Sequence, residues 1–263
     1  MGTSAVIITL NEARHIAECI ASVRFCDEVL VVDSGSTDGT PELAREAGAR
    51  VMARPFDDFA SQKNFAVSQA GREWILSLDA DERVSAELAA EIPRTLAAAA
   101  PQTAAYRMPR WNFIFGRRMR FGGGGGDRPV RLFRREGTRF HGIVHETAVF
   151  GGATEDLRNP IRHYSTPDAA SYMRKLNAYT TLEARLLKER GAGFKGSDLA
   201  LRPLGRFLQR YVAQAGFLEG HTGLVFALLS AYYEAVRYFK FWEILRPLSD
   251  RMMPRDTTRV LEK

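Results

Sequence analysis

Two aspartates separated by one residue, Asp79 and Asp81, follow an apolar run in "WILSLDADERV", residues 74–84. In an extended strand, residues i and i+2 point to the same side, so the two carboxylates would converge just past the strand end. Like charges held together repel each other, and a hard divalent cation such as Mg²⁺ or Mn²⁺ relieves that repulsion through oxygen ligation. Because Mg²⁺ often shares its site with substrate phosphates, the pair is suited to bridging a metal ion and a diphosphate. The alternative is a solvated turn before a helix.

Other polar residues follow apolar runs in the first hundred residues. The runs "SAVIITLNE", "VLVVDSGSTDGT" and "SQKNFA" supply Thr9, Asn11, Glu12, Asp33, Lys63 and Asn64. Open parallel sheets bind ligands at the carboxyl ends of their strands, so residues that follow strands are expected to meet at one edge. There, Asp33 could accept hydrogen bonds from a ribose or a base edge.

Strands that alternate with helices must position these residues. The continuous β-branched run "SAVIITL" predicts a strand buried on both faces, and "DEVLVVD", "ARVMAR" and "EWILSLD" predict three more strands. Helical segments lie between them, which predicts a parallel α/β sheet. Beyond Ala100, "AYRMPRWNFIF" and "RPVRLFRR" predict strands on either side of the glycine run 122–126, which we expect to be a mobile loop. From about Ser165 onward the pattern is helical.

The stretches "VIITLNEARHIAECIASV", "VLVVDSGSTDGT" and "QKNFAVSQAGREWILSLDADE" together resemble the family 2 glycosyltransferases over about the first 100 residues. The resemblance implies an α/β GT-A fold, the fold of nucleotide-diphospho-sugar transferases, here with a C-terminal helical extension. It divides the chain into a catalytic domain at 1–165, with a nucleotide-binding half at 1–100 and an acceptor half at 101–165, and a helical extension at 166–263. It also implies transfer of a sugar from a UDP-sugar donor, with inversion.

The same resemblance assigns residues to the donor and to a metal ion. The residues implied in donor binding are Thr9, Asn11, Glu12, Asp33, Lys63, Asn64, Asp79 and Ala80. The residues implied in holding Mg²⁺ or Mn²⁺ are Asp79, Asp81 and His163, the last in "IRHYS". Neutral imidazole is a competent ligand for such ions, although a lone histidine is often structural.

Inverting transfer needs a general base that takes a proton from the acceptor hydroxyl. In the resembled family this base is a carboxylate downstream of the Asp-x-Asp pair, and Glu146 in "FHGIVHETAVF" is the best match. The neighbouring His145 could tune Glu146 or simply pack beside it. Asp127, which precedes "RPVRLFRR", is the alternative base, and a charged residue in a β-ribbon is the structural alternative for Glu146.

The order "VRLFRR…HGIVHE…HYS" resembles, more narrowly, the lipopolysaccharide-core glucosyltransferases of this family. This implies glucose as the sugar and a lipid-linked or lipopolysaccharide-core glycan as the acceptor. The glycine run departs from the pattern expected before the "VRLFRR" stretch. Two other functions stay open: a sugar-1-phosphate nucleotidyltransferase, whose glycine-rich basic loop after the first strand is missing from "TLNEARH", and a non-catalytic module that binds nucleotide sugars or a membrane.

Charge and cysteine content limit the setting of the protein. The formal charge is +6, which suits phosphorylated substrates, anionic lipid or nucleic acid. The basic residues are spread along the tail rather than clustered with stacking residues, so no nucleic acid is expected as a partner. Cys19 and Cys26 predict free thiols in a reducing compartment, and no signal peptide is evident. We therefore expect a cytoplasmic protein.

The tail at residues 202–246 carries apolar residues at helical spacing and many basic residues. The basic set is Arg202, Arg206, Arg210, Arg237 and Lys240. Its longest apolar run, "GLVFALLSAYY", is shorter than the roughly 20 residues that a membrane-spanning helix needs. Such a tail can lie on the inner face of the cytoplasmic membrane, or pack on the catalytic domain or on a second subunit of a homo-oligomer. A lipid-linked acceptor favours the membrane.

Overall fold

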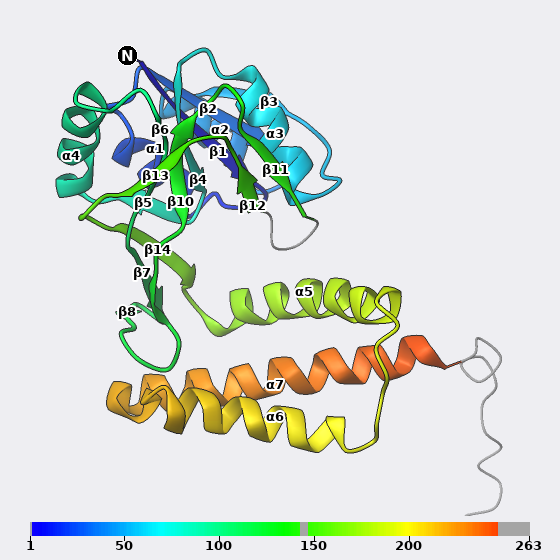
Figure 1. The fold of residues 1–263 in the computed structure, drawn as a ribbon. Coiled ribbons are helices and arrows are strands. Elements are labelled where there is room, and N and C mark those ends of the chain that lie inside the picture. Colours follow the sequence, from blue (N-terminus) through cyan, green and yellow to red (C-terminus); the bar gives the residue numbers. More distant parts are fainter. Residues whose placement is uncertain (1, 143–146, 247–263) are drawn as a thin grey trace, which may run out of the picture. The chain divides into compact units, whose positions relative to one another are not determined.

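The computed structural model describes residues 2–142 and 147–246 of the 263 in the chain. The chain forms two compact units (Figure 1). The first contains the residues up to Arg120 together with Gly124–Pro167, and the second contains Phe121–Gly123 and the residues from Asp168 onward. The boundary predicted near Ser165 lies close to this division.

A seven-stranded sheet forms the centre of the first unit, in the order β13-β6-β10-β4-β1-β2-β3. Its strands are β1 (Thr3–Thr9), β2 (Glu28–Asp33), β3 (Arg50–Ala53), β4 (Trp74–Asp79), β6 (Thr103–Arg107), β10 (Val130–Arg134) and β13 (Ala153–Asp156). The first four run parallel, as the alternating pattern predicts. The whole sheet is mixed, however, because β10 lies antiparallel between β4 and β6. A strand of the predicted acceptor half therefore lies directly beside the strand that carries Asp79.

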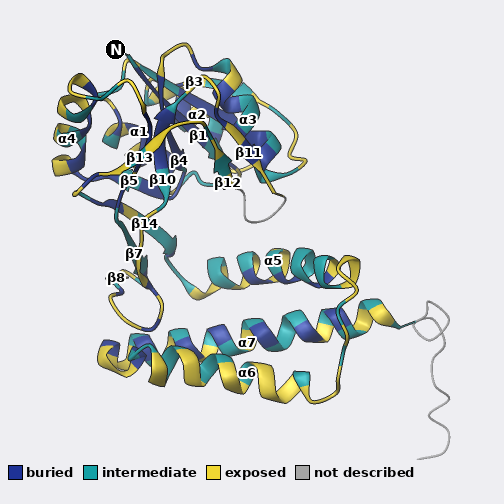
Figure 2. Ribbon diagram, in the orientation of Figure 1, coloured by how far each residue is buried: buried dark blue, intermediate teal, exposed yellow. Residues whose placement is uncertain are grey.

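Helices cover both faces of this sheet, which explains why β1 and β4 are apolar without alternation. On one face, Ile7 and Leu78 pack with α1 (Ile16–Ser22), α2 (Thr40–Glu46) and α4 (Ala86–Ala97). On the other face, Val6 and Ile75 pack with α3 (Phe59–Gln69). Successive strand residues point to opposite faces, so a strand buried on both sides must be apolar at every position. Figure 2 shows these strands as buried.

A smaller five-stranded sheet also belongs to the first unit and contains part of the predicted acceptor half. Its strands are β5 (Glu82–Val84), β14 (Ile161–Thr166), β7 (Arg110–Ile114), β8 (Arg117–Arg118) and β9 (Gly125–Asp127), which pairs with β7. A two-stranded ribbon is formed by β11 (Arg139–His141) and β12 (Thr147–Val149). The prediction that the whole glycine run is a loop is wrong, since Gly125 and Gly126 belong to β9. A Cβ at Gly125 would lie 2.6 Å from the carbonyl oxygen of Arg120, so only glycine permits this close passage.

The second unit is helical. Its helices are α5 (Ala169–Glu189), α6 (Asp198–Leu208), the π-helical turn η1 (Gln209–Ala213), the 3₁₀ turn η2 (Gly216–Glu219) and α7 (Gly220–Leu245). The backbone N–H of Phe121 donates to Glu219 at 3.0 Å, and Arg210 Nη1 donates to the Gly122 carbonyl oxygen at 3.0 Å. The beginning of the glycine run therefore has a defined path within the helical unit.

Most of the basic residues predicted to face lipid in the tail instead join the helices to one another. Arg206 donates to the buried Glu234 at 2.6 Å, and Arg237 donates to Glu183 at 2.9 Å. Lys240 donates to three residues of α5 at 2.7–2.9 Å: Asn177, Thr180 and Thr181. These charges stabilise the helix packing, and side chains engaged in this way are not available to lipid headgroups.

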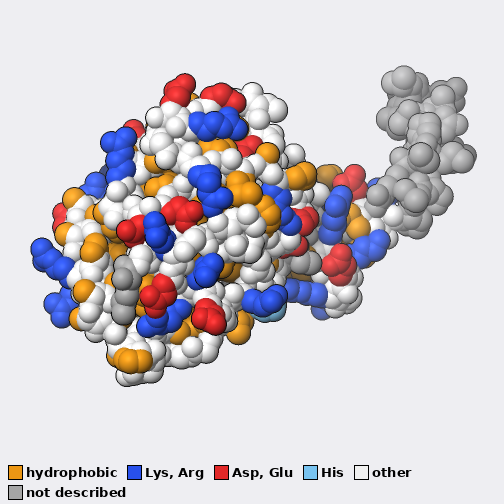
Figure 3. All heavy atoms as spheres, turned by 90° about the horizontal axis from the view of Figure 1, so that it is seen from above, with side chains coloured by type: hydrophobic (Ala, Val, Ile, Leu, Met, Phe, Trp, Pro, Cys, Tyr) orange, Lys and Arg blue, Asp and Glu red, His pale blue; other side chains and the backbone are white. Residues whose placement is uncertain are grey.

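No single helix among the described residues combines the length and apolar character of a membrane span. One bent pair, residues 198–213 and 216–245, passes that test jointly, with an angle of 71° between its parts. On the face drawn in Figure 3, Lys and Arg side chains are interspersed with Asp and Glu. That face shows no continuous basic stripe of the kind that tracks a nucleic acid backbone.

Candidate active site

Three of the predicted donor-binding residues meet at the carboxyl edge of the central sheet. Thr9 is the last residue of β1 and lies opposite Asp33, the last residue of β2. On the other side of β1, Ile8 lies opposite Asp79, the last residue of β4. Parallel pairing thus brings the ends of three strands within one residue of the same level. This is the edge at which open α/β sheets bind ligands.

Asp79 lies between two cations. Arg131 Nη2 is 2.7 Å from one carboxylate oxygen, and Lys63 Nζ is 3.4 Å from the other. Burial opposes ionisation of Asp79, but the charges of Arg131 and Lys63 outweigh it and hold its pKa well below the usual range. Lys63 itself is buried, and its ammonium group lies 5.7 Å from the centre of the Phe140 ring. The Asp79 carboxylate is therefore charged at neutral pH and fixed in direction, with about a third of its side chain (34%) exposed.

A second carboxylate, Glu82, organises the cations around Asp79. It is fully buried, and its Oε1 accepts from Arg131 at 2.7 Å and from Arg110 at 3.2 Å. Its Oε2 accepts from the backbone N–H of Asp79 at 3.2 Å. The sequence interpretation missed Glu82, Arg131 and Arg110. Their signals were a further acid after the aspartate pair and an arginine at or next to the first residue of a strand.

Asp81 lies beside His163. His163 Nε2 is 3.4 Å from Asp81 Oδ1, and His163 Nδ1 is 2.8 Å from Asn112 Oδ1. The Asn112 Nδ2 group donates to the Gly124 carbonyl oxygen at 2.7 Å, so its amide oxygen faces the imidazole and accepts from Nδ1–H. This leaves Nε2 directed toward Asp81. Strand pairing explains the arrangement, because His163 lies opposite Asn112 on β7 and opposite Glu82 on β5.

The electrostatic environment of His163 reflects these neighbours. Burial alone would lower the pKa of the imidazole, but the hydrogen bond and the charge of Asp81 raise it above its ordinary value. The histidine and the aspartate thus favour a positive charge between or beside them. A proton can supply that charge, and so can a divalent cation.

The predicted metal set is only partly gathered. Among the described residues, no three His, Cys, Asp or Glu side chains lie together as a ready site for a metal ion. Asp81 and His163 lie together, whereas the oxygens of Asp79 face Arg131 and Lys63. One carboxylate oxygen and one imidazole nitrogen are chemically suited to Mn²⁺ or Mg²⁺, with further ligands left to water or a substrate phosphate.

The loops after β1 and β2 are tied together by their own side chains. Asp33 is buried, and its carboxylate accepts from the backbone N–H groups of Gly35 and Ser36, both at 2.9 Å. Asn11 has a left-handed φ of 54°, and its side-chain oxygen accepts from the Thr37 N–H at 2.9 Å. These bonds give the edge a defined shape before any ligand arrives.

The remaining predicted donor-binding residues have diverse surroundings. The backbone N–H of Glu12 donates to the Thr40 hydroxyl at 2.9 Å, and Ala80 is buried in the core. Both polar atoms of the Asn64 amide bond the backbone of Phe140, at 2.8 and 2.9 Å, so Asn64 holds strand β11 in place. The Thr9 hydroxyl is buried and has no hydrogen-bond partner within the described part of the chain.

The structure describes one of the two candidate general bases, Asp127, and not the other. Glu146, with His145, lies outside the described residues. Asp127 lies opposite Arg110 across the β7–β9 pair, and both of its oxygens accept from that guanidinium: Oδ1 from Nε at 3.1 Å, and Oδ2 from Nη2. For Asp127 to accept a proton from a substrate, it would have to leave this bidentate pair at least in part.

Comparison with known proteins shows the family to which the chain belongs. Residues 4–179 match the family model described as glycosyl transferase family 2. The lipopolysaccharide core biosynthesis glycosyltransferase LpsC of Rhizobium meliloti is 34% identical, covering 87% of this chain and 90% of the relative. Glycosyltransferase RT0209 of Rickettsia typhi is 30% identical, covering 92% and 87%.

Two solved structures are also similar. Mannosyl-3-phosphoglycerate synthase from Rubrobacter xylanophilus is 17% identical with a TM-score of 0.46, covering 73% of this chain and 75% of that chain. Glucosyl-3-phosphoglycerate synthase from Mycobacterium tuberculosis, in complex with Mn²⁺, UDP and glucosyl-3-phosphoglycerate, is 17% identical with a TM-score of 0.46, covering 74% and 82%. The family model spans well over half of the sequence, and the α/β architecture with a helical C-terminal extension agrees with the predicted GT-A fold. The chain therefore belongs to glycosyl transferase family 2 and is a glycosyltransferase.

Proposed function

We propose that this glycosyltransferase moves a sugar, with glucose as the specific prediction, from a UDP-sugar to a lipid-linked or lipopolysaccharide-core glycan, with inversion and with Mg²⁺ or Mn²⁺. The observation that carries the proposal is the fixed, charged Asp79 at the same sheet edge as Thr9 and Asp33. The acceptor class is supported by the similarity to LpsC, whose name places it in lipopolysaccharide core biosynthesis.

The donor pocket in this proposal is built from the ends of β1, β2 and β4. The Thr9 hydroxyl is buried and lacks a partner in the described chain, so a hydrogen bond to the nucleotide would remove the cost of leaving it unsatisfied. Asp33 is already aligned by the backbone N–H groups of Gly35 and Ser36 on one oxygen and by the Ser36 hydroxyl, at 2.5 Å, on the other, and a ribose or base would donate to a carboxylate held in this way. Lys63 and Arg131 keep Asp79 ionised and prevent it from rotating away.

Asp81 and His163 are the residues that would hold the metal ion. Their oxygen and nitrogen ligands fit Mn²⁺ or Mg²⁺, and the Nδ1–H bond to Asn112 keeps His163 Nε2 turned toward Asp81. A bound ion would neutralise the negative charge that develops on the leaving diphosphate.

Proton transfer is assigned to one of two carboxylates, Glu146 or Asp127. The base takes the proton of the acceptor hydroxyl while that oxygen bonds to the anomeric carbon, and the bond from that carbon to the diphosphate oxygen breaks. UDP leaves with the bonding electron pair. Glu146 remains the preferred assignment, because Asp127 is held by both arms of Arg110.

The proposal is tested by measuring release of UDP from UDP-glucose with purified lipopolysaccharide core glycolipid as the acceptor. EDTA should abolish turnover and Mn²⁺ should restore it. Asp81→Ala should remove activity and leave the melting temperature near that of the wild type. Asp156→Ala, which removes an exposed carboxylate elsewhere in the same unit, should leave activity intact. Full activity of a folded Asp81→Ala protein would contradict the metal assignment.

We also propose that the helical unit binds the inner surface of the cytoplasmic membrane. In the described chain, 14 of the 17 large hydrophobic side chains with high exposure belong to this unit. Helix α6 has no buried residue, and Figure 2 shows it as largely exposed. Its Leu201, Leu204 and Leu208 follow one another at helical spacing and are 63%, 54% and 48% exposed. Because most basic residues of the tail are engaged between helices, this docking rests on apolar contact more than on charge.

A cytoplasmic location is part of the same proposal. It is supported by the two thiols, Cys19 and Cys26, which are both free. Free thiols are typical of reducing compartments. A homo-oligomer that covers the exposed leucines is the competing arrangement for α6.

A further inference from the structure

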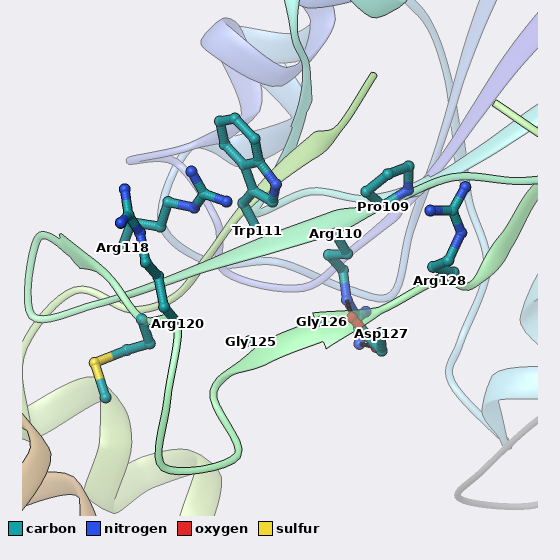
Figure 4. A pocket seen from close by; sticks show the side chains of 10 residues that line it. Pro109, Arg110, Trp111, Arg118, Arg120, Gly125, Gly126, Asp127 and Arg128 are labelled. Carbon is teal, nitrogen blue, oxygen red and sulfur yellow. Dashed lines mark hydrogen bonds and ion pairs between the residues drawn. The ribbon is translucent and has the colours of Figure 1, made fainter. Parts of the chain in front are cut away.

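A hollow whose lining includes four arginines lies beside the candidate active site. It is bounded by β7, β8, β9 and their connections, with a volume of about 410 Å³ (Figure 4). Its polar and aromatic lining consists of Arg110, Trp111, Arg118, Arg120, Asp127 and Arg128. All of these residues belong to the first unit. The volume is in the range of pockets that bind small ligands, and it is large enough for one sugar ring with a charged substituent.

The lining has more positive than negative charge. Four arginines face one carboxylate, Asp127, which Arg110 already engages through two hydrogen bonds. Arg128 lies 3.5 Å from the exposed Asp156 outside the hollow and donates to the Leu157 carbonyl oxygen at 2.8 Å. Arg118 therefore contributes positive charge that no described carboxylate neutralises, and Arg120 adds a further guanidinium group to the lining.

In the described chain, the guanidinium group of Arg118 is oriented by a stacking contact and not by an ion pair. Its guanidinium carbon lies 3.3 Å from the centre of the Trp111 ring, a stacking contact that fixes the plane of the fork (Figure 4). Within the described part of the chain, no carboxylate pairs with Arg118. Burial, and after it the charge of Arg120, lower the pKa of this guanidinium. A bound anion would offset the repulsion between these two guanidinium groups.

We infer that this hollow binds an anionic group, a phosphate monoester or a carboxylate, carried by the acceptor. A guanidinium fork with a fixed plane matches the geometry of both groups and binds them bidentately. The inference rests on the proposed function, because it assigns a chemical class to the acceptor of the same reaction. The hollow prefers acceptors with a charged substituent over neutral glycans.

The hollow is connected to the reaction centre through one residue. Arg110 lines the hollow and also donates to Glu82, which holds the backbone N–H of Asp79. Asp127, the alternative base, is in the same lining. An acceptor anchored by its anion on Arg118 would thus lie next to the carboxylates that surround the donor edge, and an arriving anion competes with Asp127 for Arg110.

The inference can be tested by binding, without turnover. The chain has three tryptophans, Trp74, Trp111 and Trp242, whose indole N–H signals can be followed by NMR in phosphate-free buffer and assigned with Trp111→Phe. Glucose 6-phosphate and glucuronate are the anionic probes, and glucose is the neutral probe. We expect at least one anion to move the Trp111 signal while glucose moves none, and Trp74 and Trp242 to stay in place as internal references.

Matched arginine variants decide whether the hollow is the site. Arg118→Gln should weaken binding of the anionic probe by about 10- to 150-fold, the effect of losing hydrogen bonds to a charged group. Arg117→Gln removes the same charge from the adjacent exposed residue, which does not line the hollow, and should change affinity by less than about threefold. Arg120→Gln should weaken binding in the same direction as Arg118→Gln, and it serves if Arg118→Gln fails to fold.

Three results would overturn the inference. The first is a Trp111 indole N–H signal whose position does not change when either anion is added. The second is an equal loss of affinity in Arg117→Gln and Arg118→Gln, which would show nonspecific attraction. The third is an Arg118→Gln protein whose UDP affinity falls as much as its affinity for the probe, since the hollow would then belong to the donor. The proposed function fails separately, if the wild-type protein binds no UDP in the presence of Mn²⁺ whatever the anions do.

Discussion

Replacing Glu82 with Gln should destabilise the protein more than any other change of a single charge around Asp79. Glu82 is fully buried, and one of its oxygens accepts from both Arg131 and Arg110. Its other oxygen accepts from the backbone N–H of Asp79. If the amide nitrogen of Gln took the place of this oxygen, two hydrogen-bond donors would face each other. Glu82→Gln keeps the size of the side chain, so packing changes little. The substitution removes the negative charge that Glu82 places beside two guanidinium groups, those of Arg131 and Arg110.

The magnitude follows from burial. Removing one partner of a buried ion pair costs about 3–5 kcal/mol when the remaining charge stays buried without compensation. Here Arg131 keeps Asp79 and Arg110 keeps Asp127 as partners, so we take the lower end, about 3 kcal/mol. For a chain of this size, each kcal/mol lowers the melting temperature by roughly 2–4 °C. We therefore expect a decrease of about 6–12 °C in thermal unfolding followed by circular dichroism, provided that the variant folds at all.

Asp127→Asn is the matched control, because Asp127 pairs with the same arginine from the exposed side. The Asp127 side chain is 49% exposed, and exposed ion pairs contribute less than about 1 kcal/mol. Its melting temperature should fall by less than about 4 °C. If Glu82→Gln and Asp127→Asn melt within about 2 °C of each other, Glu82 is not the centre of a buried charge network and the reasoning is wrong.

Four further predictions concern the donor, the base, the helical unit and the thiols. Thr9→Val removes a buried hydroxyl without a partner, so it should keep or raise the melting temperature while weakening UDP binding in calorimetry by about 2- to 12-fold; unchanged affinity would exclude Thr9 from the pocket. Glu146→Gln should lower kcat by about 10²–10⁴-fold at unchanged UDP affinity, and if Asp127→Asn loses kcat instead, Asp127 is the base. The wild-type protein should co-sediment with anionic vesicles even at high salt, and Leu204→Glu should abolish this binding. If the wild type does not bind vesicles and Leu204→Glu converts a dimer into a monomer, the partner of α6 is a second copy of the chain. Burial, and after it the charge of Asp27, raise the pKa of Cys26 to about 12, so at pH 8 this thiol stays protonated and should react with iodoacetamide only after denaturation; as the pH rises from about 9 toward 12, only the unfolded thiol ionises and stability falls.

Local pattern was sufficient to locate the edge of the sheet at which Thr9, Asp33 and Asp79 meet. The strands β1, β2 and β4 are buried on both faces, so their sequences are apolar throughout and their ends are marked by the first polar residue. Since parallel strands separated by helices must end at the same edge, Thr9, Asp33 and Asp79 could be placed together from the sequence. The structure also brings Asp81 and His163 together, while the oxygens of Asp79 face Arg131 and Lys63, and the shared metal role of the three residues stays a prediction.

Only the tertiary structure determined which charges face which. Arg131 reaches Asp79 because β10 inserts antiparallel beside β4, a pairing between segments about fifty residues apart that no local periodicity encodes. For the same reason, Asn64 was assigned to the donor but is engaged by the backbone of β11. In the tail, Arg206 appeared free to meet lipid because its partner Glu234 lies on another helix. A charged side chain acts on whatever is nearest in space, and proximity between distant segments arises from strand pairing and helix packing rather than from sequence spacing.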